Sequence, residues 1–374
     1  LYLVADGMGG HVGGARASSL VQQAFCQFLH SHLPAQGEDC SQIPWTRVFT
    51  NAVQSASQNV FRAAEIEPEL KGMGSTLTGL YCRDGFAVLA HVGDSRLYLL
   101  RAGEIHQLSI DHTYVAELIA LGSITPDQAK GHPYSHVLSR AVGVYEHVAA
   151  DVLLFELTIG DRLLLCSDGF YDIVPDEKEI LQLLSSGTLE EVCSLVEKLP
   201  FERTARDNVS CVFLEVLPNG EPQADQLARS REISLKVEML QQVDLFESLD
   251  IRDIIHLVQS GQVLRCSAGD EIVCEGKVGS SLFVILEGEV SVTIGKEAVS
   301  QLHAGNHFGE MSLLLDAPRS ATVTAISPAL VLEIDSAAFN EFCSYFPRSG
   351  MEVFRSMAKA FSGRLREANA RLSA

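Results

Sequence analysis

The sequence has 374 residues, of which 47% are hydrophobic; this length predicts two domains, and no apolar run reaches the roughly 18 residues of a membrane span. A formal net charge of −20 argues against a nucleic-acid partner, because nucleic acid is bound by basic patches, and solubility is the simplest explanation of it. The nine cysteines are scattered without a C-x-x-C pair, so they fit neither a disulfide framework nor a zinc site and favour a reducing cytoplasm.

The first part of the chain alternates between helix-like and strand-like stretches. Amphipathic stretches predict helices at residues 15–33, 45–64, 114–122 and 189–199. Short apolar runs bounded by Gly, Asp or Ser predict strands at residues 86–92, 96–100, 151–157, 162–166 and 209–216. Together they predict an α+β domain of antiparallel sheets covered by helices.

A polar stretch, "LPNGEPQADQLARSRE" (217–232), carries Pro and Gly and has no periodic apolar positions. It predicts a surface connection. We therefore expect a first domain at 1–217, a linker with a leading helix at 218–242, and a second domain at 243–374. After a helical stretch at about 235–260, many short strands separated by glycines predict a small β-barrel or β-roll with helices.

The last segment is predicted to be a helix with one apolar stripe. The stripe residues are spaced 4-3-4-3-4, at Phe354, Ala358, Phe361, Leu365, Ala368 and Leu372. Two interpretations fit this spacing. The helix packs against its own barrel, or it forms a short coiled coil and so a dimer.

Four carboxylates stand at the ends of strand-like runs. Asp6, Asp94 and Asp168 each follow an apolar run, and Asp207 precedes one. In an antiparallel sheet such ends meet at one edge, so the four acids can converge on a single rim. Each one alone is explained by turn chemistry, because Asp-Gly and Asp-Ser are ordinary turn dipeptides.

The four acids together favour a site for a hard divalent cation, Mg²⁺ or Mn²⁺, because converging carboxylates need positive charge between them. Gly7 can offer its carbonyl oxygen to the same ion, and the glycines that follow it allow the backbone to come close. Two such ions about 4 Å apart would clamp a phosphoryl group for in-line displacement.

Seven segments then carry a family resemblance: "VADGMGGH", "GMGSTL" (72–77), "HVGDSRLYLL" (91–100), "LSIDHT" (108–113), "HVLSRAVG" (136–143), "CSDGFYD" (166–172) and "RDNVS" (206–210). Their order over residues 1–216 resembles the motif series of metal-dependent type 2C (PPM) protein phosphatases in their bacterial form. The resemblance implies a β-sandwich flanked by helices that hydrolyses phosphoserine and phosphothreonine with a metal-bridging water. It also implies phosphoprotein partners, the products of a Ser/Thr kinase.

Carried over by position, the resemblance assigns the acids to metal ions. Asp6 bridges two ions, Gly7 offers its carbonyl to one of them, and Asp168 with Asp207 hold the other. Asp94 would help Asp168 to hold a weaker third ion. These residues are therefore expected at the catalytic centre.

This sequence departs from the family pattern in two places. Family members carry an upstream strand with a phosphate-binding Arg and another acid, and this sequence starts after that point without Met. We expect it to be a fragment, so that an inactive chain of this length would not exclude an active parent. Some relatives also have a His where this chain has Met8; His11 is the candidate proton donor here, and a solvated surface histidine is the alternative.

Other matching segments receive supporting roles. Residues 112–136 resemble the mobile flap that lies beside the family's active site. Structural roles are expected for Ser75, Thr76 and Arg140.

A second site is indicated by "FGEMSLLLDAPRSATV" (308–323). A small anion can bind free amides there, with Arg319 closing a charge-assisted contact. Glu310 is unsuited to an anion unless the ligand also donates a hydroxyl, so a sugar phosphate fits the pair. The alternative is an ordinary surface ion pair between Glu310 and Arg319.

The wider pattern from 243 to 372, with "LFESL", "AGDEIVCEG" and "SLFVILEGEVSV", resembles the cyclic nucleotide-binding domains of cyclic-nucleotide-dependent kinases and catabolite activator-type regulators. The resemblance implies Glu310 on the ribose 2′-hydroxyl and Arg319 on the cyclic phosphate, with close contacts from Gly309, Ser320 and Ala321. The regulatory ligand is then cAMP or cGMP. A hydroxyl at Ser320 occurs in binders of either purine, so the base stays open.

The sequence therefore predicts a cytoplasmic Mg²⁺- or Mn²⁺-dependent Ser/Thr protein phosphatase regulated by a cyclic nucleotide. A cyclic-nucleotide sensor or scaffold with an inactive phosphatase-like domain is the alternative. Adenylyl or phosphoryl transfer is disfavoured, because neither a P-loop nor a kinase-type glycine loop is present.

Overall fold

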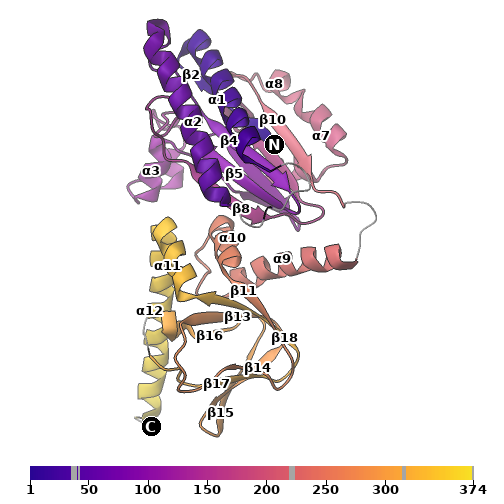
Figure 1. Cartoon of the computed structure of the whole chain (residues 1–374), viewed down its shortest axis with the longest axis vertical. Helices are drawn as coiled ribbons and strands as arrows, with labels where there is room; N and C mark the ends of the chain where they lie inside the picture. The colour runs from indigo at the N-terminus through magenta and orange to yellow at the C-terminus, as the bar shows by residue number, and fades with distance from the viewer. Residues whose placement is uncertain (35–39, 41–42, 219–223, 314–316, 373–374) are drawn as a thin grey trace. The chain divides into compact units, whose positions relative to one another are not determined.

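The computed structural model describes residues 1–34, 40, 43–218, 224–313 and 317–372, without the side chains of 11, 224–227, 230, 364–365 and 367–372. It divides into two compact units, Leu1–Pro222 and Gln223–Ala374 (Figure 1). Each unit is described by itself below. Among the described helices, none combines the length and apolar character needed to cross a membrane.

Two antiparallel four-stranded sheets form the first unit. The first sheet has the order β1 (Tyr2–Val4), β4 (Leu77–Arg83), β5 (Phe86–Val92), β8 (Asp151–Glu156). The second has the order β10 (Cys211–Glu215), β9 (Arg162–Cys166), β6 (Arg96–Arg101), β7 (Glu104–Gln107). A separate two-stranded pair joins β2 (Gly7–Met8) to β3 (Gly74–Ser75).

Helices cover the outer face of each sheet. The long helices α1 (Gly10–His32) and α2 (Trp45–Ile66) lie over the first sheet in Figure 1. They share an apolar cluster with alternate residues of β5, Val88, Ala90 and Val92. The second sheet packs against α5 (Asp168–Ile173), α6 (Glu177–Ser185), α7 (Leu189–Val196) and α8 (Leu199–Glu202). This arrangement confirms the predicted α+β fold of sheets covered by helices.

The inner faces of the two sheets are rich in leucine. Because successive side chains of a strand point to opposite faces, the residues that do not face the helices face the other sheet. All of these inner residues are buried: Leu80, Leu89, Leu97, Leu99, Leu153, Phe155, Leu163 and Leu165. The burial of these apolar side chains holds the two sheets together.

A buried ion pair lies at one end of the sandwich. Arg101 at the end of β6 donates from Nε to Oδ1 of Asp161 at 2.9 Å and from Nη2 to Oδ2 at 2.7 Å. Nη2 also donates to the carbonyl oxygen of Glu156 on β8 at 2.8 Å. Thr158 donates its amide and its hydroxyl to the same Asp161 carboxylate. Arg101 therefore joins the two sheets through a buried, hydrogen-bonded ion pair.

The second unit is a β-roll with helices, as predicted. Its sheets have the orders β11-β18-β13-β16 and β12-β17-β14-β15. Their strands are β11 (Gln262–Cys266), β12 (Glu271–Val273), β13 (Ser281–Glu287), β14 (Glu289–Ile294), β15 (Glu297–His303), β16 (His307–Phe308), β17 (Thr322–Ala325) and β18 (Ala329–Asp335). The helices α10 (Ile251–Ser260), α11 (Ser336–Tyr345) and α12 (Pro347–Leu372) and the short 3-10 helix η2 (Glu310–Leu313) complete it.

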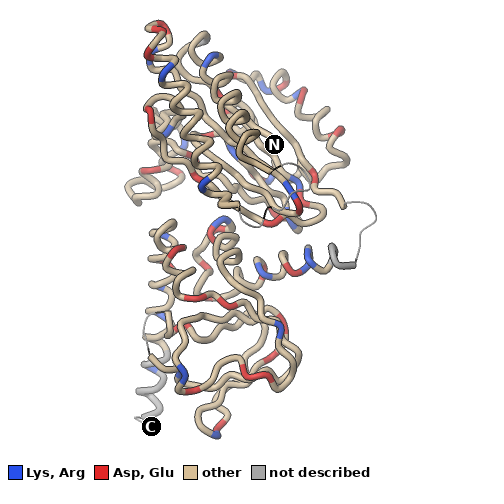
Figure 2. The backbone as a smooth tube through the Cα atoms, in the orientation of Figure 1, with Lys and Arg blue, Asp and Glu red and all other residues tan. Residues whose placement is uncertain are grey.

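The sequence interpretation was wrong about part of the polar connection. Residues from 224 onward belong to α9 (Ala224–Gln242), which contacts α10 and β13. The helix buries Ile233, Val237 and Leu240 at helical spacing, whereas Ala228 and Arg229 near its start are exposed. Blue and red positions alternate along α9 in Figure 2, and Lys236 pairs with Glu232 at 3.2 Å. The first residues of α9 are mostly polar and show no helical spacing of apolar residues. The sequence pattern therefore did not reveal that the helix begins at Ala224.

In the part of the terminal helix whose side chains the structure describes, the buried positions differ from those expected. Leu365, Ala368 and Leu372 of the expected stripe lie outside the described side chains. Val353 and Met357 of α12 are buried, whereas Phe354 of the expected stripe is 37% exposed. Phe354 still contacts Phe339 of α11, with ring centroids 5.5 Å apart. The helix thus packs against its own domain through Val353 and Met357, which are adjacent to the expected positions 354 and 358. Dimerisation through α12 stays a prediction.

The buried Arg101–Asp161 pair gives a stability prediction. Arg101→Met should lower the unfolding free energy of the first unit by about 3 kcal/mol, because it leaves Asp161 buried without its cation. Trp45, the single tryptophan, is buried in α2, so its fluorescence in urea reports on this unit. Adding Asp161→Asn to Arg101→Met should recover part of the loss.

The control is Lys130→Met, which breaks the pair between Lys130 and Asp127, whose side chains are 81% and 89% exposed. It should change the unfolding free energy by less than about 0.5 kcal/mol. If Arg101→Met is as mild as this control, the buried pair does not hold the sheets together.

Candidate functional site

Asp6 leaves β1 on a backbone that is fixed by its neighbours. Its amide donates to Oγ1 of Thr76 at 2.9 Å, and its carbonyl oxygen accepts from the Thr76 amide at 2.8 Å and the Ser75 hydroxyl at 2.9 Å. The next residue has to be glycine, because a β-carbon on Gly7 would lie 1.9 Å from the carbonyl oxygen of Gly14 in α1. Ser75 and Thr76 therefore act on the backbone that presents the Asp6 carboxylate.

Asp94 lies in the turn between β5 and β6 and is only 6% exposed. The amide of Gly93 donates to Nδ1 of His112 at 3.1 Å, and the His112 amide donates to the Gly93 carbonyl oxygen at 2.8 Å. The Ser95 hydroxyl bonds Oγ1 of Thr76 at 2.7 Å. The turn that carries Asp94 is therefore tied to the residue that holds Asp6.

Asp168 follows β9 and Asp207 precedes β10, and these two strands are antiparallel neighbours. The amide of Ser167 donates to the carbonyl oxygen of Ser210 at 3.0 Å. The amide of Ser210 donates to the hydroxyl of Ser167 at 3.1 Å. These bonds hold the two acid-bearing loops side by side.

A glycine allows the closest approach between these loops. A β-carbon on Gly169 would lie 2.2 Å from the carbonyl oxygen of Asn208. The two acids differ in their surroundings, because Asp168 is half-buried and Asp207 is exposed. One oxygen of Asp207 accepts the Asn208 amide at 2.7 Å, which leaves the other carboxylate oxygen for a ligand.

The carboxylates repel one another. The pKa of Asp6 rises from 3.8 to about 7, chiefly through burial and then through Asp168, with smaller effects of Asp207 and Asp94. Burial and the Asp168 charge likewise raise the pKa of Asp94 to about 7. Among the described residues, Oδ1 of Asp168 is buried without a hydrogen-bond partner. The rim therefore holds protons or positive charge more readily than four separate carboxylates would.

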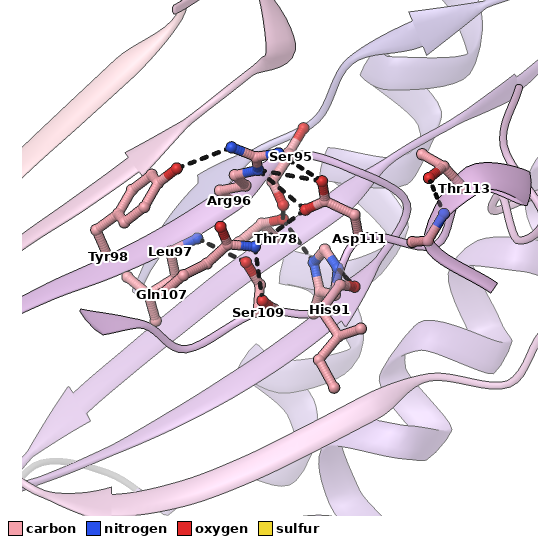
Figure 3. Close-up of polar contacts among 12 residues, drawn as sticks. Thr78, His91, Ser95, Arg96, Leu97, Tyr98, Gln107, Ser109, Asp111 and Thr113 are labelled. Carbon is pink, nitrogen blue, oxygen red and sulfur yellow. Dashed lines mark hydrogen bonds and ion pairs between the residues drawn. The ribbon is translucent and has the colours of Figure 1, made fainter. Parts of the chain in front are cut away.

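Arg96, the cation nearest to Asp94 in the sequence, is committed elsewhere (Figure 3). Its Nη2 lies 2.6 Å from Oδ2 of Asp111 and its Nε 3.0 Å from Oδ1, and Nη1 donates to the Tyr98 hydroxyl at 3.0 Å. Its Cζ lies 3.7 Å from the ring centroid of Tyr171, and Tyr171 acts to lower the pKa of Asp94 against the larger effect of burial. Because Asp111 balances the charge of Arg96, Arg96 does not neutralise the four carboxylates of the rim.

The donor set fits Mg²⁺ or Mn²⁺ in type. Carboxylate and carbonyl oxygens are the ligands these ions prefer, and the buried partnerless oxygen of Asp168 lies among them. In the described part of the chain, no three His, Cys, Asp or Glu side chains stand in the geometry of a closed metal site. An open rim suits ions such as Mg²⁺, which keep several waters and take few protein ligands.

Sequence reasoning missed two residues of the rim. Tyr171 acts to lower the pKa of Asp94, and Asp172 has a raised pKa because of burial and the nearby Asp168 charge. Both lie in the quoted segment "CSDGFYD". The available signal was the spacing of Tyr171, three residues after Asp168 in α5, which places both on one side of a helical turn.

The remaining expected residues lie at the edges of the site. The His11 side chain lies outside the described residues, so its role stays a prediction. Nη1 of Arg140 lies 3.2 Å from Nε2 of His112 and 3.2 Å from Oδ1 of Asp151, a bracing contact rather than a free side chain. The segment 112–136 contains the short helices α3 (Tyr114–Ala120) and α4 (Pro126–Ala129).

The second unit contains a pocket of about 440 Å³, a size suited to a small-molecule ligand. All five expected contact residues line it, namely Gly309, Glu310, Arg319, Ser320 and Ala321. Apolar walls come from Val273, Val292, Val299, Leu302 and Val323. Because Glu310 and Arg319 are only 6% and 9% exposed, the alternative of a surface ion pair is wrong.

Neighbouring protein groups hold the Arg319 guanidinium in place. Its Nη1 donates to the carbonyl oxygens of Ser281 at 2.9 Å and Gly309 at 3.3 Å and to the hydroxyl of Ser312 at 2.8 Å. These acceptors are uncharged, so they fix the side chain without cancelling its charge. Only a glycine fits against the Nε edge, because a β-carbon on Gly279 would lie 2.6 Å from Nε. The pocket thus presents a buried, oriented positive charge, which suits a phosphate.

Two family models match the chain. Residues 1–199 match "Protein phosphatase 2C", and residues 263–346 match "Cyclic nucleotide-binding domain". The first match covers more than half of the chain, and the second covers the strands and pocket of the second unit. Both resemblances noted in the sequence are confirmed.

The relatives are bacterial enzymes. "Serine/threonine protein phosphatase PstP" of Mycobacterium tuberculosis is 37% identical over 217 residues, which are 58% of this chain and 40% of that relative. This chain thus spans less than half the length of that protein. "Serine/threonine phosphatase stp" of Listeria monocytogenes is 33% identical over 216 residues, which are 58% of this chain and 84% of the relative.

Solved structures share the fold of the first unit. The Mycobacterium tuberculosis PstP/Ppp crystal structure is 36% identical, with a TM-score of 0.52 over 58% of this chain and 88% of that one. The catalytic domain of PstP "in complex with 2 Manganese ions" is 35% identical, with a TM-score of 0.50 over 58% and 87%. That relative therefore binds two manganese ions within the fold seen here.

The acid rim gives a pH prediction for the metal-free chain. Because the pKa values of Asp6 and Asp94 rise from 3.8 to about 7, the folded chain keeps protons that the unfolded chain releases. The unfolding free energy should then fall as the pH rises from about 4 to about 7. Asp6→Asn should raise it at pH 8 by about 1 kcal/mol, after allowance for solvent screening, and flatten the pH dependence.

Urea unfolding followed by Trp45 fluorescence, with a chelator present, measures this effect in the first unit alone. The matched control is Glu65→Gln, which removes an exposed carboxylate on α2 and should leave the pH profile unchanged. An Asp6→Asn chain that is less stable than the parent at pH 8 would contradict repulsion at the rim.

Proposed function

This chain belongs to the protein phosphatase 2C family, and from that membership we propose that its first unit hydrolyses phosphoserine and phosphothreonine in proteins. The observation that carries the proposal is the shared rim of Asp6, Asp94, Asp168 and Asp207, which brings strongly interacting carboxylates together. The substrates are phosphoproteins made by Ser/Thr kinases. A cytoplasmic location is part of the proposal and agrees with its free cysteines.

The rim residues have distinct proposed roles. Asp6 would help to hold both Mg²⁺ or Mn²⁺ ions, the Gly7 carbonyl oxygen would help to hold one of them, and Asp168 with Asp207 would hold the other. The bound ions would supply a water nucleophile at neutral pH and neutralise the charge of the phosphoryl group. Asp94 adds negative charge next to Asp168 and would help to hold a third ion.

The chain itself keeps these groups in position. Two hydrogen bonds with Thr76, one donated by the Asp6 amide and one accepted by the Asp6 carbonyl oxygen, fix the backbone of Asp6. The Ser167–Ser210 bonds fix the loops that carry the other two ligands. Since displacements of about 1 Å are enough to slow a reaction strongly, these bonds matter for the rate. We assign His11 as the candidate proton donor to the leaving serine or threonine.

For the second unit we propose a cyclic nucleotide, cAMP or cGMP, as the ligand. The oriented guanidinium of Arg319 would bind the cyclic phosphate, and the buried carboxylate of Glu310 would accept the ribose 2′-hydroxyl. Gly309 leaves room for this approach, with φ of 82° in the left-handed region. Ser320 and Ala321 line the same pocket and supply close contacts.

We further propose that this ligand regulates the phosphatase. The presence of both domains in one chain motivates the coupling. A ligand shifts an activity only if it binds two conformations of the protein unequally, and typical couplings are about 1–3 kcal/mol. The turnover of a phosphopeptide should therefore change several-fold on ligand binding.

Phosphatase activity is tested first. The full-length gene product with Mn²⁺ should release phosphate from a phosphothreonine peptide, and Asp6→Asn and Asp168→Asn should each lower kcat by about 100-fold or more. Glu65→Gln should keep the parent rate, and Trp45 fluorescence shows whether each variant is folded. Variants as fast as the parent would refute the assigned ligands. A product that binds nucleotide but has no Mn²⁺-dependent turnover would favour the sensor alternative.

Regulation is tested in the same assay. Saturating cAMP or cGMP should change the turnover several-fold, and Arg319→Lys should shift the response to ligand concentrations at least about 10-fold higher, because it loses the forked contact with the phosphate. Arg265→Lys is the control, since that side chain is 72% exposed and lies outside the pocket lining. Equal rates with and without saturating ligand would contradict the regulation.

A further inference from the structure

Two cysteines face each other beside the acid-bearing loops. Cys166 ends β9 and Cys211 begins β10, and the register pairs them directly. Residues directly opposite in an antiparallel pair project to the same face of the sheet, and both belong to the apolar cluster beneath the outer helices. Both are free thiols, Cys166 buried and Cys211 partly buried. The two cysteines lie 45 positions apart in the sequence, and only the strand pairing brings them together.

The hydrogen bonds of the ladder define the type of this pair. Antiparallel pairs alternate between those that exchange hydrogen bonds and those that do not. Ser167 bonds Ser210 on one side of the cysteines, and the amide of Val216 bonds the carbonyl oxygen of Asp161 at 2.9 Å at the other end. Each bond joins two directly opposite residues, as in a hydrogen-bonded pair of an antiparallel ladder. Because the two types alternate along the ladder, the next pair, Cys166 and Cys211, is a non-hydrogen-bonded pair.

This pair type has the geometry that a disulfide needs. In a pair without exchanged hydrogen bonds the Cα atoms are roughly 4.5 Å apart and the side chains are closest. Disulfides span Cα distances of about 4.4–6.8 Å. Neither strand has to change register to join the two sulfurs.

We propose that Cys166 and Cys211 are a thiol pair that a peroxide converts reversibly to a disulfide. Hydrogen peroxide transfers one oxygen atom to the sulfur of the more accessible Cys211, which gives a sulfenic acid and releases water. The sulfur of Cys166 then attacks the Cys211 sulfur, the S–O bond breaks, and the leaving hydroxide takes the Cys166 proton as a second water. Two thiols thus lose two electrons, and one peroxide gains them.

The resting chain keeps these thiols reduced. Burial raises the pKa of Cys211 to about 12, so the reaction with peroxide is slow at neutral pH and needs sustained exposure. In reducing compartments disulfides are rare and, where present, are mostly transient or regulatory. A pair that reacts only under oxidative stress fits that class.

The bond would join the bases of two acid-bearing loops. Cys166 is two positions before Asp168, and Cys211 is four positions after Asp207. A disulfide fixes the S–S length near 2.05 Å and the dihedral angle near 90°, so it would tighten the strand ends that hold these loops. This thiol chemistry does not rest on the proposed phosphatase function, because it is detected by mass rather than by turnover.

The test is peptide mapping of the 374-residue chain. The folded chain is treated with hydrogen peroxide, remaining thiols are alkylated, and a non-reducing digest is analysed by mass spectrometry. We expect one linked peptide pair that contains Cys166 and Cys211 and that dithiothreitol separates. Recovery of both cysteines as alkylated thiols after prolonged oxidation would overturn the proposal.

Two variants sharpen the result. Cys193 is exposed on α7, which packs against β10, so Cys193→Ser should leave the linked peptide unchanged. Cys211→Ser should abolish it while Trp45 fluorescence shows that the chain is folded. A link between Cys193 and Cys211 in the unsubstituted chain, in place of the proposed one, would also overturn the proposal.

Discussion

Repulsion among carboxylates at one rim of the sandwich is the constraint on which the first unit depends. Asp6 and Asp94 both have pKa values raised to about 7, in each case through burial and the charge of Asp168. Arg96 does not relieve the repulsion, because its guanidinium is paired with Asp111. Protons or bound cations stabilise such a cluster by neutralising it, so the electrostatics of the rim, like its ligand types, favour the proposed cation site.

The same constraint explains why the surrounding backbone is so closely braced. Repelling side chains would open the rim if their loops were free to move. Each loop is instead bonded to a neighbour, Asp6 to Thr76 and the Asp168 loop to the Asp207 loop. The glycines at 7 and 169 permit these close approaches, since a β-carbon at either position would overlap backbone atoms. Rigidity at the rim is therefore built from backbone contacts, and the carboxylates stay available to ligands.

What the sequence could reveal depended on how local each signal was. An apolar run that ends in Asp is visible in the sequence, and antiparallel pairing alone brings Asp168 and Asp207 to one edge. The pairing of Arg96 with Asp111 and the contact of Tyr171 with Asp94 cross between elements, so no period or motif announces them. The polar start of α9 was missed for a related reason, because its neighbours Ile233 and Val237 supply the packing that stabilises the helix.

In the second unit the buried charge is positive rather than negative. The contacts around it indicate which elements a bound ligand would affect first. Arg319 is a buried cation held by neutral acceptors, one of which is Ser312 in η2. That short helix contacts α11, and α11 contacts α10 and α12. Ser349 of α12 donates to the Asp253 carboxylate of α10, and α10 contacts α9, the helix that follows the boundary between the units. A phosphate that draws Arg319 away from Ser312 would therefore act first on η2 and α11, and it would alter activity only if this helical layer has two arrangements that the ligand binds unequally.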